Sequence, residues 1–365
     1  MENGVIKAAG KGLIMSKKIV LVTGNMGYIG TVLVPMLLEH GHEVIGLDSC
    51  IFERCSIEEF ESKTPLKIID IRDIAIKDLE GFDAVIHLAG MSNDPLGDYN
   101  EYITYEINHA ATVSLAQKAK AAGVSRFLFA SSCGNYGVSG NDWITEESEF
   151  QPIRPYARSK ILSEQGLTEL SDENFSPVFL RASTAYGVSP MLRFDLVINN
   201  LTAWAISTNR VHLKSTGNAW RPVVHIRDIA RAYIAALEAP RDLVHNEAFN
   251  VGTTTENYKV HELAEFIREA VGDCVIEYDS DAKPDPVSYR VDCNKIARTL
   301  PGFKPEWTLR HGVQELCGTL RHLKIKPSDF EGPRFQRLEH LKLLLSREIL
   351  TKEYRIATLH DHRAG

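Results

Sequence analysis

The chain of 365 residues is 44% hydrophobic and 24% charged, so it can bury one large core or two ordinary ones. Its formal charge of -7, without a basic run interleaved with aromatic residues, argues against a nucleic-acid-binding surface. No apolar run approaches the length of a membrane span, so we expect neither nucleic acid nor a membrane as a partner.

The six cysteines are scattered, without a CxxC pair or other close partners. This spacing favours free thiols in a reducing compartment over a disulfide framework. It also gives no set of metal ligands. We therefore expect a cytoplasmic protein without a metal site.

Short apolar runs alternate with longer helical stretches from residue 17 onward, as is typical of an α/β protein with a doubly wound parallel sheet of the Rossmann type. The predicted strands are residues 17–24, 42–48, 65–70, 82–90, 125–132 and 176–183, and the predicted helices are residues 28–40, 99–122 and 157–170. We expect the Rossmann domain to span residues 17–185, after a loose extension at residues 1–16. Beyond it the rhythm loosens, which predicts a smaller mixed α/β domain at residues 186–325, with some chain crossing back, and a helical tail at residues 326–365.

The segment TGNMGYIG joins the first predicted strand to the first predicted helix and contains Gly24, Gly27 and Gly30. Glycine lets the backbone bend tightly and approach a pyrophosphate, and the helix N-terminus supplies N–H groups. The second strand ends at Asp48, whose carboxylate can accept hydrogen bonds from adenosine ribose hydroxyls and would repel a 2′-phosphate. The sequence therefore predicts NAD rather than NADP, although Arg54 lies nearby.

Two further strand ends extend the predicted cofactor site. Asp70 ends the third strand, where it can meet the adenine edge or simply cap the following turn. The fourth strand ends in HLAG, and Ala89 and Gly90 allow the backbone to lie against the cofactor. The other cofactor contacts predicted around these turns are Tyr28, Ile29, Ile71 and Leu88.

The segment YARSK places Tyr156 and Lys160 on one face of a predicted helix. Such a pair is often only a packed ring beside a surface charge. Here, however, the fifth strand ends in Ser131 and Ser132, at the sheet edge where a doubly wound fold binds ligands, so we expect both hydroxyls beside the nicotinamide. If the helix packs at that edge, Lys160 and the positive nicotinamide ring together lower the pKa of Tyr156 and make the phenol a usable base.

The motifs TGNMGYIG, HLAG, SSCGNYG and YARSK, together with Asp70, resemble the NAD-dependent epimerase/dehydratase family of extended short-chain dehydrogenases/reductases that act on nucleotide sugars. The resemblance covers residues 17 to about 322. It implies that Tyr156 is the catalytic base, that Lys160 also contacts the nicotinamide ribose and that Ser132 binds the reacting hydroxyl. It further places Asn108 near the active site and implies a homodimer formed through the helices at residues 99–122 and 157–170.

The resemblance also suggests the reaction. Tyr156 would take the proton of a sugar hydroxyl, at C4, while the carbon gives hydride to NAD, and return of hydride to the other face would give the 4-epimer. A 4,6-dehydratase of this family has an Asp–Glu pair after the serine or threonine, where this chain has Cys133 and Gly134, so dehydration is disfavoured. Cys133 is expected to be a packed residue at the substrate site. A 4-ketoreductase and a non-catalytic NAD sensor remain as alternatives.

The smaller domain is expected to bind the nucleotide diphosphate. The resemblance puts Arg221 on the diphosphate, a role that suits a guanidinium, with Arg290 as a weaker candidate. Thr184 stands where the family often has asparagine. The remaining residues expected to line the substrate pocket are Arg193, Asn199 and Asn200.

Overall fold

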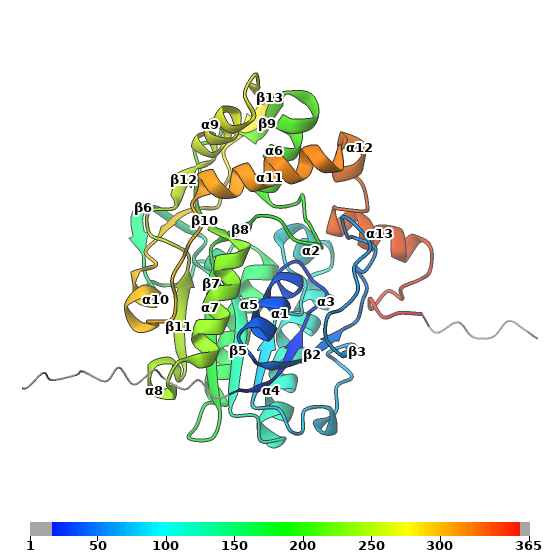
Figure 1. The fold of residues 1–365 in the computed structure, drawn as a ribbon, viewed down its shortest axis with the longest axis vertical. Coiled ribbons are helices and arrows are strands. Elements are labelled where there is room, and N and C mark those ends of the chain that lie inside the picture. Colours follow the sequence, from blue (N-terminus) through cyan, green and yellow to red (C-terminus); the bar gives the residue numbers. More distant parts are fainter. Residues whose placement is uncertain (1–16, 358–365) are drawn as a thin grey trace, which may run out of the picture.

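The computed structural model describes residues 17–357, with the side chains of residues 139–141 excepted, so the predicted extension and the last eight residues of the predicted tail lie outside the description. Its centre is a seven-stranded sheet in which every neighbouring pair is parallel (Figure 1). Across the sheet the order is β11 (Glu247–Val251), β7 (Ser176–Ala182), β5 (Arg126–Ser132), β4 (Ala84–His87), β1 (Ile19–Thr23), β2 (Glu43–Asp48) and β3 (Leu66–Ile68). All six predicted strands are present, and the predicted Rossmann fold is confirmed.

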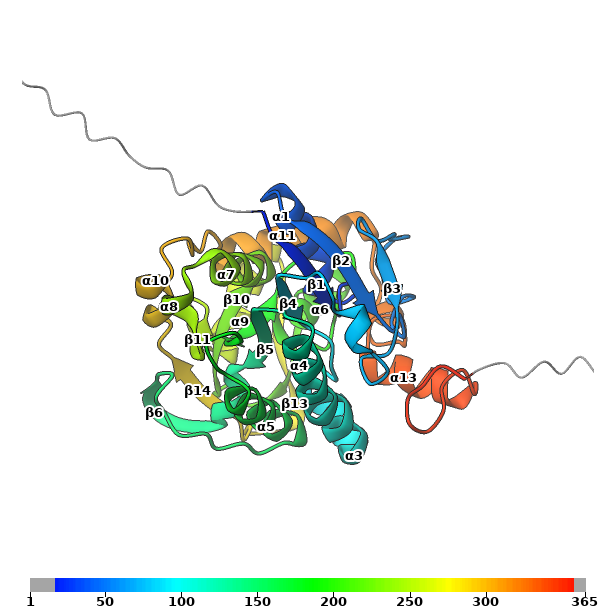
Figure 2. The same cartoon turned by 90° about the horizontal axis from the view of Figure 1, so that it is seen from below.

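Helices cover both faces of this sheet, because alternate side chains of each strand point to opposite faces. On one face, α1 (Gly30–Glu39) and α7 (Ile226–Glu238) pack on Val20 and Val22. On the other face, α4 (Ala111–Ala121) and α5 (Pro155–Glu169) pack on Leu21, Phe127 and Phe129. Figure 2 shows the two layers on either side of the strands.

The stretch predicted as one helix at residues 99–122 is divided in the structure. It contains the end of α2 (Asp94–Tyr99), then α3 (Glu101–Tyr105), a π-helical turn (Glu106–Ala110) and α4. The break falls at Asn100, whose extended backbone ends α2 and whose side chain accepts a hydrogen bond from Ile103 N at 3.1 Å, capping α3. The π-helical turn places Asn108 at the inner side of the bend.

The later part of the chain both returns to the large sheet and forms a smaller lobe. Strand β11 pairs with β7, so chain beyond residue 185 completes the sheet. The smaller lobe has its own apolar core and short sheets. Its elements are β8 (Thr184–Tyr186), α6 (Val197–Thr208), β9 (Arg210–Ser215), β10 (Trp220–His225), β12 (Asn257–Lys259), α9 (Val260–Val271), β13 (Val275–Lys283) and α11 (Leu309–Leu323). We keep the domain boundaries after residues 185 and 325 as a prediction.

Three further features complete the described chain. Strand β14 (Ser288–Val291) pairs with β6 (Val138–Ile144) beside the two lobes. The tail contains α12 (Pro327–Phe330) and α13 (Arg337–Ser346) and runs back along the β2 and β3 side of the large sheet (Figure 1). Within residues 17–357, no helix is long and apolar enough to cross a membrane.

Candidate active site

A cavity of about 840 Å³ lies at the carboxyl ends of the central strands, between the two lobes. This is where an open parallel sheet binds ligands, because its strand order reverses there. The predicted residues that line it are Gly24, Gly27, Tyr28, Ile29, Gly30, Asp48, Asp70, Ile71, Leu88, Ala89, Gly90, Ser131, Ser132, Tyr156, Lys160, Thr184, Arg193 and Arg221. Both the cofactor half and the substrate half of the predicted site therefore open into one space.

The glycine-rich turn between β1 and α1 leaves no space for side chains. Gly24 has φ +72°, and a Cβ there would lie 2.7 Å from Ala89 N. A Cβ on Gly30 would lie 2.5 Å from the Gly24 carbonyl oxygen, so the turn can be this tight only with glycine. The turn opens into the cavity at the start of α1, which fits the pyrophosphate of a dinucleotide.

The Asp48 carboxylate is fixed by the backbone around it. It accepts hydrogen bonds from Met26 N at 3.1 Å and Cys50 N at 2.8 Å, while burial raises its pKa. The free lone pairs of the carboxylate remain available on the cavity side for ribose hydroxyls. Arg54 is exposed and does not line the cavity, so it offers no counter-charge for a 2′-phosphate there.

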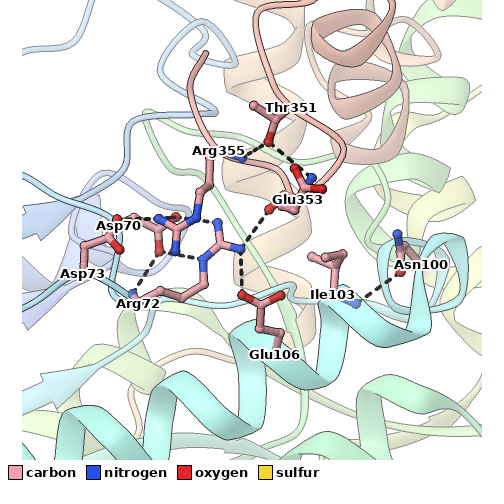
Figure 3. Close-up of polar contacts among 9 residues, drawn as sticks. All are labelled: Asp70, Arg72, Asp73, Asn100, Ile103, Glu106, Thr351, Glu353 and Arg355. Atoms are coloured by element: carbon pink, nitrogen blue, oxygen red, sulfur yellow. Dashed lines mark hydrogen bonds and ion pairs between the residues drawn. The ribbon is translucent and has the colours of Figure 1, made fainter. Parts of the chain in front are cut away.

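Asp70 is held by an arginine that the sequence analysis did not single out. Arg72 donates from Nε to Asp70 Oδ1 at 3.0 Å and from a terminal nitrogen to Oδ2 at 2.6 Å (Figure 3). Burial opposes ionisation of Asp70, but the hydrogen bonds and charge of Arg72 outweigh it and hold the pKa of the carboxyl below its usual value. Arg72 also binds Glu106 and the Glu353 carbonyl.

Tyr156, Lys160 and Ser132 meet at the end of β5. The Ser132 hydroxyl hydrogen-bonds the Tyr156 hydroxyl and accepts a hydrogen bond from Gly134 N at 3.0 Å. The Lys160 ammonium lies over the Phe129 ring, 4.7 Å from its centre. Proline at the first position of α5 starts this helix at residue 155, which directs its first turn into the cavity.

The folded chain by itself raises the pKa of Tyr156, so Lys160 alone does not give the lowering predicted for the phenol beside Lys160 and the nicotinamide ring. The pKa of Tyr156 is raised to about 12, chiefly by burial and then by the charge of Asp94, against the opposing Ser132 hydrogen bond and Arg193 charge. Burial also lowers the pKa of Lys160 to about 8, against the opposing charge of Glu164. Desolvation is therefore the largest influence on both groups. The positive ring of oxidised nicotinamide would favour the phenolate.

The first serine of the motif, Ser131, is bonded to Glu164 and not to Tyr156. The Ser131 hydroxyl donates to the buried Glu164 carboxylate, which also forms a two-pronged ion pair with Arg181, the shortest contact being 2.6 Å. Arg181 also donates a hydrogen bond to the Tyr136 hydroxyl at 2.9 Å. Ser131 borders the cavity, but its hydroxyl belongs to this buried network beneath the site.

Two residues placed near the chemistry by the sequence analysis do not line the cavity. The Asn108 amide donates to Met91 O at 3.0 Å and to Ser159 Oγ at 3.1 Å, and its oxygen accepts from Met91 N at 2.7 Å, so it joins the loop after β4 to α5. Cys133 is fully buried, with Sγ 3.1 Å from Arg181 O, and burial raises its pKa to about 12. Asn108 thus supports the site from behind, and Cys133 is packed rather than substrate-facing.

The predicted substrate residues divide in the same way. Arg193 and Arg221 line the cavity, paired with Asp195 at 2.7 Å and Asp285 at 2.5 Å. The other three do not line the cavity: Asn199 binds Arg193 O and Gly187 N, Asn200 binds Phe194 O, and the Arg290 guanidinium stacks over Trp143 and Trp220.

The cavity lining also contains residues that sequence reasoning missed, among them Asp94, Arg337 and Tyr354. Asp94 begins α2, which packs on Tyr156 so closely that a Cβ on Gly97 would lie 3.0 Å from the Tyr156 Cβ. Its position just after HLAG, at the carboxyl edge, is a signal that could have found it. Arg337 and Tyr354 come from the tail and carry no recognisable motif.

Comparison with known proteins places these features in a family. The NAD dependent epimerase/dehydratase family matches residues 20–252. UDP-glucose 4-epimerase of Bacillus subtilis is 27% identical over 332 residues, which are 82% of this chain and 94% of that protein. The Corynebacterium glutamicum UDP-glucose 4-epimerase is 28% identical, covering 79% of this chain and 91% of its own.

Solved structures agree with the sequence comparison. MoeE5 in complex with UDP-glucuronic acid and NAD has a TM-score of 0.71 and 26% identity, covering 83% of this chain and 99% of its own. UDP-glucose 4-epimerase of Thermotoga maritima, with UDP-glucose, has a TM-score of 0.72 and 25% identity, covering 83% and 99%. The predicted resemblance is confirmed: this chain belongs to the NAD dependent epimerase/dehydratase family, and its cofactor is NAD.

Proposed function

We propose that this protein is an NAD-dependent nucleotide-sugar epimerase that inverts C4 of its sugar through a transient 4-keto intermediate. The observation that carries the proposal is that Ser132, Tyr156 and Lys160 line the same cavity, with the Lys160 nitrogen 5.9 Å from the centre of the Tyr156 ring and Ser132 a hydrogen-bonding neighbour of the phenol. A hydroxyl bound between Ser132 and Tyr156 would have a proton acceptor and a hydrogen-bonding partner at once.

This geometry gives Tyr156, Ser132 and Lys160 separate roles in the reaction. Tyr156 accepts the proton of the C4 hydroxyl and later returns it. Ser132 holds the same oxygen while it is a ketone. The Lys160 ammonium nitrogen, 5.9 Å from the centre of the Tyr156 ring, would stabilise the phenolate once it has formed. NAD, when bound, takes hydride from the sugar carbon and gives it back. Return to the opposite face of the ketone yields the epimer.

Arginines support a nucleotide diphosphate at the other end of the sugar pocket. Arg193 and Arg221 line the cavity, and a planar guanidinium suits a phosphate through paired donors. Arg221 is now bound to Asp285, so we infer that a diphosphate would compete with this carboxylate for the guanidinium. The UDP-glucose 4-epimerase activity of the sequence relatives makes UDP-glucose and UDP-galactose the first substrates to test.

The residues after Ser132 argue against dehydration by a carboxylic acid at that position. Cys133 is buried away from the cavity, and Gly134 has no proton to transfer. One observation nevertheless favours a second candidate, a 4,6-dehydratase: Asp94 lines the cavity near Tyr156, and burial raises the pKa of this carboxyl. A carboxyl with a raised pKa can hold and donate a proton, as removal of water requires.

One experiment separates these reactions. Purified protein is incubated with UDP-glucose or UDP-galactose in deuterated water without added cofactor, and the products are examined by NMR. An epimerase gives the C4 isomer without solvent deuterium on carbon. A dehydratase gives a deuterated 6-deoxy-4-keto sugar, and a NAD sensor shows binding without turnover. A 4-ketoreductase turns over only in a parallel incubation with added NADH, which it consumes in proportion to product. Any outcome except the first contradicts the proposal for these sugars.

We also propose a cytoplasmic homodimer formed through the helices around residues 99–122 and 157–170. Supporting features are the exposed apolar side chains Tyr102 and Leu162, which are 75% and 38% exposed on these helices. The six cysteines are free, which suits a reducing compartment. Sedimentation equilibrium of the wild type and of Leu162→Glu tests the dimer, since a charge at the interface would favour the monomer.

A further inference from the structure

The C-terminal tail is fastened to the large sheet at two places. At its beginning, Arg334 donates to the carbonyl oxygens of Ser56 and Ile57 at 2.8 and 2.9 Å, in the connection after β2. At its end, Arg355 binds the Asp73 carboxylate, and Arg72 donates to the Glu353 carbonyl at 2.8 Å (Figure 3). The tail segment, residues 334–355, is therefore held across the adenosine side of the cavity.

An apolar cluster fills the space beneath this tail segment. The cluster joins the tail to the loop and helices that follow β4, and its buried members are Met91, Leu96, Ile103, Leu341, Leu350 and Tyr354. Burial of such side chains stabilises a fold more than an exposed ion pair does, so the tail segment is part of the folded core. Its side chains can therefore present fixed groups to the cavity.

Arg337 is one of these groups, and its electrostatic situation is unusual. It lines the cavity and is only 4% exposed. One terminal nitrogen donates to Met191 O at 3.0 Å, but the other has no hydrogen-bond partner. Among residues 17–357 no carboxylate lies within 4.0 Å of its guanidinium. Asp195 is the carboxylate whose charge acts on Arg337, but both of its oxygens are already bound by Arg193.

A buried cation without a counter-ion is costly, and an unpartnered buried donor adds to the cost. Burial lowers the pKa of Arg337, and the charge of Arg193 adds to this; the neighbouring Cys55 thiol and the charge of Asp195 oppose it without reversing it. The guanidinium also lies 5.4 Å from the centre of the Phe52 ring, four residues after Asp48. Arg337 thus lies between Phe52, which follows the end of β2 at Asp48, and the segment of Met191 and Arg193 on the expected substrate side.

We propose that Arg337 binds a diphosphate within the cavity, and that the tail segment holds its guanidinium in position for this contact. The diphosphate is that of the dinucleotide or, resting on the proposed function, that of the nucleotide sugar. In either case two phosphate oxygens would supply the missing partner and counter-charge at once. The tail lies outside residues 20–252, so this contact is additional to the glycine-rich turn.

The test is calorimetric titration of the full-length protein, stripped of cofactor, with NAD, adenosine and UDP. In Arg337→Met we expect the affinity for NAD to fall by about ten-fold or more, with adenosine binding unchanged, because only the charge-assisted bonds to phosphate are lost. A fall for UDP in place of NAD assigns the diphosphate to the nucleotide sugar. Arg347→Met, which removes an equal charge from the exposed end of α13, should change none of these affinities.

Unchanged binding of both NAD and UDP by Arg337→Met would overturn the proposal, whatever sugar the enzyme turns over. Thermal unfolding provides a second readout. Because the buried charge has no counter-ion, the melting temperature of the cofactor-free variant should equal or exceed that of the wild type, while the rise produced by the affected diphosphate ligand shrinks. If the methionine variant does not fold, Arg337→Gln is titrated and judged by the same two outcomes.

Discussion

The Lys160 ammonium nitrogen lies 5.9 Å from the centre of the Tyr156 ring, one turn farther along α5. Both side chains line the same cavity. Burial moves their pKa values in opposite directions, to about 12 for Tyr156 and about 8 for Lys160. Each shift favours the uncharged form. The pair therefore holds its proton on the phenol until further positive charge or a hydrogen-bonding hydroxyl arrives beside it.

Replacing the phenol hydroxyl tests the centre of the mechanism. Tyr156→Phe should lower kcat by about 10²–10⁴, the usual contribution of a positioned acid–base group. Affinity for NAD should change little, because the ring and the glycine-rich turn are kept. Steady-state epimerisation and fluorescence titration with NAD measure the two effects. Tyr278→Phe, an exposed tyrosine on β13, is the control, and full activity in Tyr156→Phe would contradict the assigned role.

Asp94 should set the pH at which Tyr156 works. Its negative charge raises the pKa of Tyr156, so Asp94→Asn should lower that pKa. The rise in kcat with increasing pH, which reports ionisation of the base, should then move to lower pH. The two proteins should be compared at pH values at which Asp94 is ionised, because only the ionised carboxylate can act on Tyr156 through its charge. Burial raises the pKa of Asp94, so this range begins at a higher pH than for an ordinary carboxyl.

The pH dependence of kcat for the wild type and Asp94→Asn is the measurement. A shift to higher pH, or none, would show that Asp94 does not act on Tyr156 through its charge. Asp98→Asn is the matched control, because this second carboxylate of α2 pairs with Arg154 at 2.8 Å at the exposed side of the cavity. If Asp94 instead supplies the proton for dehydration, its replacement removes deuterated product altogether.

The parts of this site that the sequence predicts are those fixed by backbone. Strands buried on both faces are continuous apolar runs, and their carboxyl ends meet at one edge, so Asp48, Ser132 and the glycine-rich turn could be brought together from spacing alone. Asn108 and Asn199 show where this reasoning stops. An amide near a site can face a ligand or a backbone carbonyl, and spacing does not distinguish the two.

The remaining differences arise from contacts between distant segments. Arg72 and Glu353 are 281 positions apart, and no local pattern in the tail predicts that they meet. The raised pKa of Tyr156 likewise depends on how completely the folded chain excludes water, which the pairing of a tyrosine with a lysine does not reveal. The family match ends at residue 252, before the tail segment that contributes Arg337 to the cavity.

The buried ion pair beneath β5 should stabilise the site only as an intact unit. Glu164 and Arg181 are each 7% exposed, and their shortest contact is 2.6 Å. Glu164→Gln leaves a buried guanidinium without its counter-charge, so we expect the free energy of unfolding to fall by about 3–5 kcal/mol. The double variant Glu164→Leu with Arg181→Met should recover part of this loss, because no charge is left unpaired. Urea unfolding of the three proteins measures it, and equal destabilisation of single and double variants would contradict the explanation.

The cluster in Figure 3 should control how fast the cofactor leaves. Arg72 is the inner member: its side chain is 5% exposed and joins Asp70, Glu106 and the Glu353 carbonyl. Arg355 is the outer member, 37% exposed, and binds Asp73 with Asp70 4.0 Å away. Exposed ion pairs contribute about 0–1 kcal/mol, whereas loss of one partner of a largely buried pair costs several times more.

Arg72→Met should therefore increase the dissociation rate of NAD by about ten-fold or more, since it frees the end of the tail segment and leaves Asp70 without its partner. Arg355→Met should increase the rate by only about two- to five-fold, as expected for an exposed pair. Stopped-flow displacement of NAD by excess ADP-ribose gives both rates, and limited proteolysis reports whether residues 347–357 become accessible. The larger effect is expected for Arg72→Met because Arg72 is the more buried of the two arginines. Equal dissociation rates in the two variants would therefore show that Arg72 does not hold the tail.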